Sequence, residues 1–275
     1  MIVTRFAPSP TGLLHLGHAF AAITACESGE RFVVRIEDID ASRCRADYVA
    51  AIFEDLEWLG LSWERPVMRQ SDRTAAYRTA LKKLQAEGLV YPCFCTRKEI
   101  ADEIARAVEA PHGSDGPNYP GTCRHLREPE REARLASPYA LRLDVAKALE
   151  ITGPLTFREQ GQGPNREHGT IDVRPFGDVV LSRKDIPAAY HLAVVVDDAE
   201  QEISLVTRGN DLFASTHVHR LLQRLLDLPE PRYAHHRLIV DAHGKKFAKR
   251  DGAVTLRALR AAGATPRSVR AQVGL

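Results

Sequence analysis

Two histidines separated by two residues, His15 and His18, stand near the N-terminus behind a turn rich in Pro, Ser, Thr and Gly. An apolar, β-prone run over residues 2–6 enters this turn and an apolar periodic segment over residues 16–25 leaves it, which predicts strand, loop and helix. The N-terminus of such a helix points free N–H groups and a positive dipole end at the loop, where phosphate is the natural occupant. Both imidazoles share one face of the first turn, and Gly17 leaves room for a flat base. The stretch predicts an ATP site; for the two histidines alone, a solvated surface turn is the alternative.

Residues 5–18, Arg-Phe-Ala-Pro-Ser-Pro-Thr-Gly-Leu-Leu-His-Leu-Gly-His, resemble the signature of class I aminoacyl-tRNA synthetases specific for glutamate, including their HIGH motif. Since H-x-G-H also occurs in other nucleotidyltransferases, the octapeptide over residues 5–12 carries most of the specificity. The resemblance implies that His15 and His18 are catalytic and bind ATP together with Gly17. It also implies glutamate contacts from Arg5, Ala7 and Ser9.

The composition indicates a globular protein without a membrane segment. The chain has 275 residues, 44% of them apolar, and no long uncharged apolar run, so it can bury one large core and a smaller second one. It carries no secretory signal pattern at its start, which makes the cytoplasm the expected location. Five cysteines without export signals favour reduced thiols or metal ligands over disulfides. A net charge of +2 leaves nucleic-acid binding to be argued from local patches.

Acidic residues lie at the end of the second predicted strand, residues 31–39, which completes a β-α-β unit and implies a parallel sheet. Glu37, Asp38 and Asp40 could bind a hard metal ion, and a solvated acidic strand end is the alternative. The family resemblance instead implies that Glu37 receives the amino group of the amino acid, while Arg5 binds its carboxylate bidentately. Amphipathic segments over residues 46–59, 74–87 and 213–226 are predicted to be packing helices, the first two ending at glycines.

Three cysteines gather in the middle of the sequence, in Cys93-Phe94-Cys95 and, after a turn-rich segment, at Cys123. Thiolates are the ligands that a structural zinc prefers, but three leave a tetrahedral site one ligand short. The glutamyl-Q tRNA(Asp) synthetases carry Cys-x-Cys followed by Tyr-x-x-x-Cys, and this resemblance implies Tyr119 as the fourth ligand. His125 or His112 could take that place, and free cysteines are the alternative to a zinc site.

Residues 124–185 suggest a small mixed α/β module, with strands expected at 139–143, 171–173 and 179–181. In class I synthetases an insertion here grips the tRNA acceptor end. Four arginines in this region could meet phosphates, although interleaved glutamates make a mixed-charge helix at least as good an interpretation. These arginines are Arg124, Arg127, Arg131 and Arg134.

The chain becomes strongly apolar again over residues 190–198 and 203–207, which are expected to be buried strands. Residues at the carboxyl ends of parallel strands border a ligand crevice. The resemblance places Tyr190 and Arg208 in contact with bound glutamate, with Arg208 as the partner of its side-chain carboxylate. A further strand is expected at residues 237–240.

A basic loop bounded by glycines, residues 244–252, resembles the second class I signature, Lys-Met-Ser-Lys-Ser. Lys246 and Lys249 match and are implied to bind ATP, with Lys249 the principal catalytic phosphate contact. Phe247, Ala248 and Arg250 depart from the pattern. Loss of the central Ser hydroxyl removes a hydrogen bond worth about 1 kcal/mol, which affects the rate more than the reaction type.

The remaining residues 253–275 suffice for two short helices, whereas ordinary glutamyl-tRNA synthetases continue with a large anticodon-binding region. We therefore expect an α/β fold without an anticodon-binding domain. Its Rossmann-type catalytic domain would comprise residues 1–88 and 176–275, interrupted by a zinc-binding insertion over residues 89–175.

The resemblance to glutamyl-Q tRNA(Asp) synthetases covers almost the whole chain. It implies tRNA-independent activation of L-glutamate with ATP and magnesium, and transfer of glutamate to queuosine in the anticodon of tRNA(Asp), by a monomer. A truncated glutamyl-tRNA synthetase that charges an acceptor end is the nearest alternative. A nucleotidyltransferase or ligase acting without RNA, and a non-catalytic RNA-binding protein, are the others.

Overall fold

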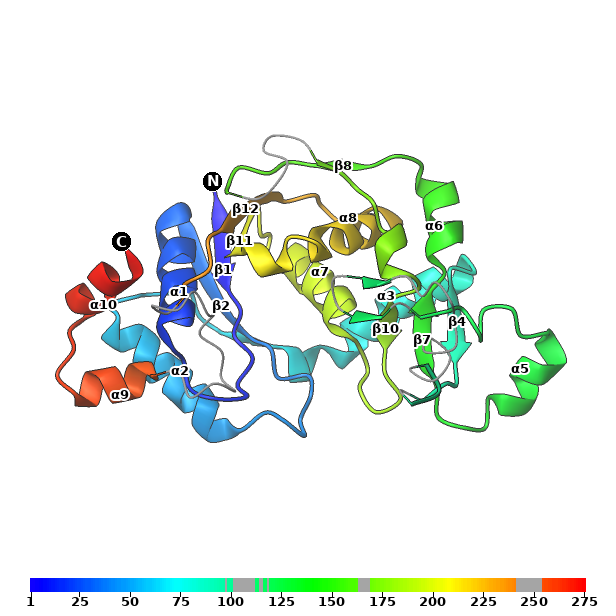
Figure 1. Ribbon diagram of the computed structural model, residues 1–275, viewed down its shortest axis with the longest axis horizontal. Coiled ribbons are helices and arrows are strands. Elements are labelled where there is room, and N and C mark those ends of the chain that lie inside the picture. Colours follow the sequence, from blue (N-terminus) through cyan, green and yellow to red (C-terminus); the bar gives the residue numbers. More distant parts are fainter. Residues whose placement is uncertain (97, 101–111, 114–115, 118, 163–168, 241–253) are drawn as a thin grey trace.

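The computed structural model describes residues 1–96, 98–100, 112–113, 116–117, 119–162, 169–240 and 254–275. Figure 1 shows an elongated molecule, with parallel strands towards the side of the two termini and a small antiparallel sheet towards the opposite end. Within the described ranges, no helix combines the length and the apolar character that crossing a membrane requires.

Parallel strands form two sheets that lie side by side. One has the order β1 (Val3–Phe6), β2 (Arg31–Ile36) and β3 (Met68–Arg69), and the other pairs β11 (Leu205–Gly209) with β12 (Arg232–His236). The backbone N–H of Ser204 donates to the carbonyl of Val3 and so joins the two sheets. The predicted β-α-β opening and parallel sheet are confirmed.

Helix α1 (Leu16–Ser28) connects β1 to β2, and its buried face combines three alanines with Phe20 and Ile23 and packs against β1. Helices α2 (Ala46–Trp58) and α3 (Thr74–Ala86) are followed by Gly60 and Gly88, whose φ angles are 77° and 65°. Because glycine adopts such angles without strain, the predicted glycine stops are confirmed. Near the C-terminus, α9 (Leu256–Ala261) and α10 (Pro266–Val273) are the two short helices expected there, and α10 packs against α1.

The strand expected over residues 190–198 is wrong, because these residues begin helix α7 (Tyr190–Glu200). The side chains from Leu192 to Val195 are each at most 2% exposed. A helix buried around most of its circumference has no polar face, so its sequence shows no helical periodicity and resembles a buried strand. The predicted helix over residues 213–226 is confirmed as α8 (Ser215–Leu225), which packs against α7.

The strand expected at residues 237–240 is also wrong, since the strand is β12, which ends at His236. Its sequence, Arg-Tyr-Ala-His-His, is too polar to match an apolar strand pattern, although Tyr233 and His235 are buried. The outer edge of β12 is covered by residues 158–162. Backbone N–H groups of Gln160 and Gln162 donate to the carbonyls of Tyr233 and His235, each over 2.7 Å.

A small antiparallel sheet has the order β10 (Val180–Ser182), β7 (Ala140–Leu143) and β4 (Val90–Cys93). It confirms the strands predicted at 139–143 and 179–181, whereas residues 171–173 are not a strand. The strand lies just before them instead, where β9 (Gly169–Thr170) pairs with β8 (Thr156–Phe157). The 3₁₀ helix η2 (Arg174–Phe176) follows directly after residues 171–173. Around this sheet lie helices α5 (Glu128–Arg134) and α6 (Val145–Thr152) and the strand pair β5 (His112–Gly113) with β6 (Gly116–Pro117).

The largest buried apolar cluster contains residues from both ends of the molecule, among them Val3 of β1, Leu143 of β7 and Leu222 of α8. The antiparallel sheet therefore packs onto the same core as α7 and α8. The domain boundaries at residues 88 and 176 stay a prediction. A separate small cluster surrounds the cysteines and includes Tyr91 and Phe94.

Candidate active site and metal centre

A cavity of about 490 Å³ opens at the carboxyl ends of β1 and β11. Its wall brings together residues that are far apart in the sequence but were all expected to contact glutamate. These are Arg5, Ala7, Ser9, Glu37, Tyr190 and Arg208. His18 also lines the cavity, so it adjoins the N-terminus of α1.

Two arginines that are neutralised by carboxylates support one side of the cavity, Arg5 in its wall and Arg35 buried behind it. Arg5 Nε lies 3.1 Å from Asp198 Oδ1, and Arg35 Nη1 lies 2.7 Å from the same oxygen. Arg35 Nη2 also lies 3.2 Å from Glu37 Oε1. Burial raises the pKa of Asp198, but Arg5 and Arg35 outweigh it and hold that pKa below its usual value.

Glu37 is the carboxylate of this network that faces the cavity. Burial raises its pKa, although Arg35 and Arg5 act in the opposite direction. A cation placed next to Glu37 would therefore be favoured, because it would stabilise the charged carboxylate. This is the environment that an ammonium group of a substrate requires.

Arg208 is 6% exposed, and its hydrogen-bonding partners are uncharged groups. Nε donates to His235 Nε2 over 3.1 Å, Nη2 donates to Thr216 Oγ1 over 2.6 Å, and Nη1 lies 3.0 Å from His219 Nδ1. Burial, reinforced by the charge of Arg208, lowers the pKa of His219 well below its usual value. Within the described part of the chain, no carboxylate lies within ion-pair distance of Arg208. A guanidinium has five N–H groups, so one on each terminal nitrogen remains for a ligand.

Tyr190 lies at the first turn of α7 and is 37% exposed, with its ring centroid 5.4 Å from that of His219. It belongs to the wall of the cavity. It therefore stands between the histidines behind Arg208 and the open cavity.

The N-terminus of α1 is capped by its own histidines. His15 Nδ1 accepts the backbone N–H of Gly17 over 3.1 Å, and His18 Nδ1 accepts that of His15 over 3.2 Å. When neutral, both rings must carry their proton on Nε2, which can donate to a ligand oxygen. A Cβ on Gly17 would lie 3.1 Å from His15 Cε1, so a larger residue would displace this ring. Lys246 and Lys249, expected to bind ATP with these residues, lie outside the described residues.

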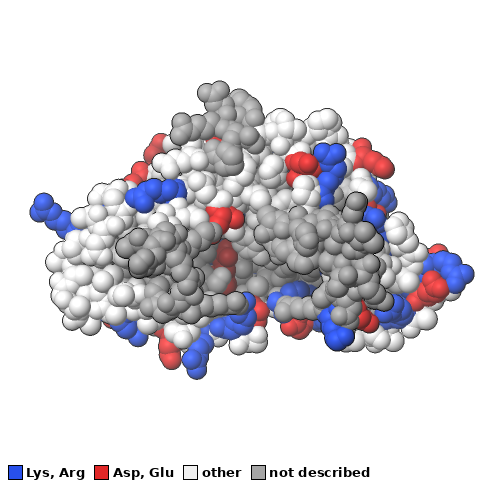
Figure 2. Space-filling view, viewed as in Figure 1, with Lys and Arg blue, Asp and Glu red and all other residues white. Residues whose placement is uncertain are grey.

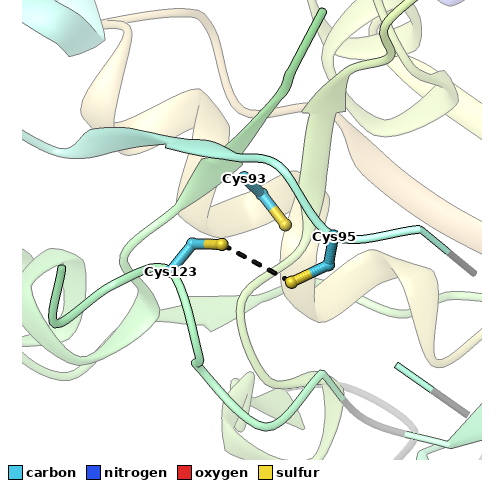
Figure 3. Close-up of side chains that lie close together, drawn as sticks. All are labelled: Cys93, Cys95 and Cys123. Atoms are coloured by element: carbon cyan, nitrogen blue, oxygen red, sulfur yellow. Dashed lines mark hydrogen bonds between the residues drawn. The ribbon is translucent and has the colours of Figure 1, made fainter. Parts of the chain in front are cut away.

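Three thiols converge in the candidate metal centre, as Figure 3 shows. Cys93 ends β4, Cys95 follows it, and Cys123 comes from the loop before α5; their sulfur atoms all lie within 4.8 Å of one another. Zinc binds sulfur at about 2.3 Å in a tetrahedron, which places the sulfurs of one site at such separations. Burial raises the pKa of Cys95 to about 12, whereas hydrogen bonds from Tyr119 and from Phe94 N–H oppose burial and lower that of Cys123. The cluster fits a zinc ion.

The phenol of Tyr119 lies beside the thiols, with its oxygen 3.7 Å from Cys95 Sγ. The same oxygen accepts the backbone N–H of Cys123 over 2.7 Å. Of the alternative fourth ligands, His125 is exposed and accepts a hydrogen bond from Arg124, and the side chain of His112 lies outside the described residues. The geometry thus favours Tyr119 over His125.

The arginines around α5 have local partners. Arg127 pairs with Glu130 over 2.7 Å, Arg124 pairs with Asp178 over 3.1 Å, and Arg134 lies 4.8 Å from the ring centre of Phe94. Figure 2 shows basic and acidic side chains interspersed around the margin of the face it displays. Carboxylates of the protein therefore balance Arg124 and Arg127, which agrees with the mixed-charge interpretation of this region.

Several residues that shape the cavity were not expected from the sequence. Asp198 and Arg35 fix Arg5 and Glu37, whereas Thr216, His219 and His235 surround Arg208. One feature of the sequence could have identified Asp198, which together with Asp197 ends an apolar run. Burying a charged side chain is costly unless it is paired, so a carboxylate at this position indicates a buried ion pair. His235 gave no comparable signal.

Comparison with known proteins relates the whole sequence to one protein family. The family model described as tRNA synthetases class I (E and Q), catalytic domain, matches residues 1–275. A relative from Rhodobacter capsulatus, named glutamyl-Q tRNA(Asp) synthetase, is 48% identical over the full length of both chains. Another from Methylococcus capsulatus, named glutamate--tRNA ligase 1, is 39% identical over 98% of this chain and 57% of its own length.

A solved structure agrees with the sequence matches. The crystal structure of glutamate-tRNA synthetase from Elizabethkingia anophelis superposes with a TM-score of 0.74 at 29% identity. The match covers 91% of this chain and 53% of that one. The parallel-sheet fold is thus shared with about half of a longer protein.

Proposed function

This chain belongs to the family of class I tRNA synthetases for glutamate and glutamine, and we propose that it joins L-glutamate to RNA in two steps. In the first, glutamate reacts with ATP to give glutamyl-adenylate and pyrophosphate. In the second, the glutamyl group passes to a hydroxyl of a tRNA. Like its relatives, the chain is a ligase of the aminoacyl-tRNA synthetase type.

The observation that carries this proposal is the charge pattern of the cavity. Arg208 presents a buried guanidinium that has no carboxylate partner among the described residues, and Glu37 presents a carboxylate that a cation would stabilise. An amino acid with an ammonium group and a second carboxylate supplies both complements.

The chain's own residues would position the reactants for in-line attack of the substrate carboxylate on the α-phosphorus. His15 and His18 donate from Nε2 to phosphate oxygens, and Gly17 admits the base. We propose that Lys249 and Lys246 neutralise the departing pyrophosphate. Magnesium would accompany ATP and reduce repulsion between the charged reactants.

We propose queuosine in the anticodon of tRNA(Asp) as the acceptor. This is supported by the name of the Rhodobacter capsulatus relative, which matches the full length of this chain. The second candidate is the acceptor end of a tRNA, which the 39% identity to the Methylococcus capsulatus glutamate--tRNA ligase favours.

We also propose that the enzyme acts as a monomer. Its catalytic domain would comprise residues 1–88 and 176–275, with an inserted domain over residues 89–175. One zinc ion would be held there by Cys93, Cys95, Tyr119 and Cys123.

The deciding experiment measures two activities with the same preparation. Glutamate-dependent exchange of pyrophosphate into ATP, without RNA, tests the first step. Transfer of labelled glutamate is then compared among tRNA(Asp) with queuosine, tRNA(Asp) without it, and tRNA(Glu). We expect exchange without RNA and label only on the queuosine-containing tRNA. Label on tRNA(Glu) would favour the second candidate, and absence of exchange would contradict the proposed activation.

A further inference from the structure

A chain of buried hydrogen bonds leads from Glu159 to Arg208. Glu159 is 3% exposed, His235 is 1% exposed, and the two join residues 158–162 to strand β12. Glu159 Oε2 lies 2.6 Å from His235 Nδ1, and His235 Nε2 accepts from Arg208 Nε over 3.1 Å. The two ends of this chain are 49 positions apart in the sequence and belong to different parts of the fold.

The geometry assigns to Glu159 the role of a positioning residue that fixes the His235 tautomer and thereby aims Arg208 at the substrate carboxylate. This inference rests on the proposed function, since it concerns the same cavity. Glu159 itself does not touch the substrate. Its effect passes through the imidazole of His235.

The tautomer follows from the donors around the ring. Arg208 Nε–H can only donate, so His235 Nε2 must accept and the ring proton must lie on Nδ1. Thr216 Oγ1, 3.3 Å from the same nitrogen, is consistent with an accepting Nε2. Only an acceptor next to Nδ1 can hold this arrangement, and the Glu159 carboxylate is that acceptor.

The other carboxylate oxygen of Glu159 also accepts hydrogen bonds. Oε1 accepts the backbone N–H of Gly161 over 2.8 Å and that of His235 over 2.9 Å. Burial acts to raise the pKa of Glu159, but the hydrogen bonds donated by His235 hold it below its usual value. Burial lowers the pKa of His235, against the effect of Glu159. At neutral pH the pair is therefore an ionised carboxylate and a neutral imidazole.

Glutamine cannot replace Glu159 in this position, although it has nearly the same shape. If its amide nitrogen faces His235, the ring must accept at Nδ1 and carry its proton on Nε2, where it opposes the N–H of Arg208. If the amide nitrogen takes the other place, it faces the two backbone donors. The first orientation opposes one pair of buried donors and the second sets the amide against two backbone N–H groups, so the first is favoured and its conflict falls directly on Arg208.

The test compares Glu159→Gln with the unaltered protein in glutamate-dependent pyrophosphate exchange. We expect the KM for glutamate to rise by about tenfold to a hundredfold, which is the loss of one hydrogen bond to a charged group. The KM for ATP should stay unchanged, because His15 and His18 do not contact this chain of bonds. A merely structural defect would alter both KM values or the thermal unfolding midpoint.

Two further variants make the assignment specific. Glu230→Gln is the matched control, since Glu230 forms an ion pair with Arg220 of α8 over 2.8 Å, away from the cavity. It should leave both KM values unchanged. In a His235→Ala background, Glu159→Gln should cause no additional loss, because its effect passes through the absent ring. If Glu159→Gln does not fold, His235→Ala alone should still raise the KM for glutamate selectively.

The outcomes separate this inference from the proposed function. Exchange by the unaltered protein together with an unchanged KM for glutamate in Glu159→Gln would overturn the positioning role. Equal losses in Glu159→Gln and Glu230→Gln, or additive losses with His235→Ala, would also overturn it. No exchange by the unaltered protein would instead contradict the proposed activation of glutamate.

Discussion

Arg208 is held by two imidazoles and a hydroxyl, whereas Arg5 and Arg35 are paired with carboxylates. A buried cation without a counter-ion is costly, and a ligand carboxylate removes part of that cost. The cavity therefore favours a ligand with an anionic side chain. A neutral side chain of similar length, such as that of glutamine, would leave the guanidinium uncompensated.

Arg208→Lys tests whether this preference depends on the fixed shape of the guanidinium. An ammonium is a point charge and cannot satisfy His235, His219 and Thr216 while also binding a carboxylate. We expect the KM for glutamate to rise by about a hundredfold, as measured by pyrophosphate exchange.

The matched control for that variant is Arg220→Lys on α8. Arg220 donates to the carbonyl of Thr156 and pairs with Glu230, outside the cavity. It should keep the KM for glutamate of the unaltered protein. Equal affinity for glutamate in Arg208→Lys would remove Arg208 from the substrate site.

Sequence could identify the residues of the cavity wall but not the residues that hold them. Arg5 and Glu37 stand in short stretches of sequence that resemble those of a known family. Asp198, the partner of Arg5, lies 193 positions from it, and Glu159 lies 76 positions from His235. Such contacts depend on how the strands and helices pack, and no local periodicity encodes them.

At the scale of the elements, the errors also have a common cause. Helix α7 was expected to be a strand because burial removes its polar face, and β12 was missed because its buried positions include a histidine. Elements with one apolar face, such as α2 and α8, were predicted correctly. Periodicity reports partial burial, so it fails where an element is buried on all sides or is held by polar side chains.

The end of β4 and the loop before α5, which bring the three thiols together, give a prediction at this scale. Purified protein should contain about one zinc ion per chain, and Cys123→Ser should lower that content, because the other sulfurs then lack their partner. A strong chelator should lower the thermal unfolding midpoint of the unaltered protein. Metal analysis and thermal unfolding measure both effects.

Cys26→Ser provides the control for the metal prediction. Cys26 lies on α1, partly buried and outside the cluster of thiols. Its replacement should change neither the zinc content nor the response to the chelator. Metal-free protein with an unchanged unfolding midpoint would argue for three free cysteines.

At the scale of the whole molecule, histidines with a lowered pKa make stability depend on pH. Burial, with a smaller effect of Arg208, lowers the pKa of His191 to about 4, from about 6.5 in an unfolded chain. Between these values the unfolded state binds more protons, so this contribution is complete above about pH 6.5 and is lost as the pH falls towards 4. For His191 alone, going from pH 7 to pH 5 should cost about 2 kcal/mol in the free energy of unfolding.

Urea unfolding at pH 7 and pH 5 measures this contribution. His191→Gln should lose less stability between the two values than the unaltered protein, because a glutamine does not bind the proton. The exposed His125→Gln serves as control and should behave like the unaltered protein. The same pH dependence in all three proteins would exclude His191 as a source.

The backbone hydrogen bonds between residues 158–162 and β12 also bear on aggregation at high protein concentration. An open strand edge offers N–H and C=O groups to a neighbouring chain and invites sheet-to-sheet aggregation. On β12 these groups are bonded internally, and at the far margin β3 offers only Met68 and Arg69. The segment that carries Glu159 therefore also closes a surface on which aggregates could otherwise grow.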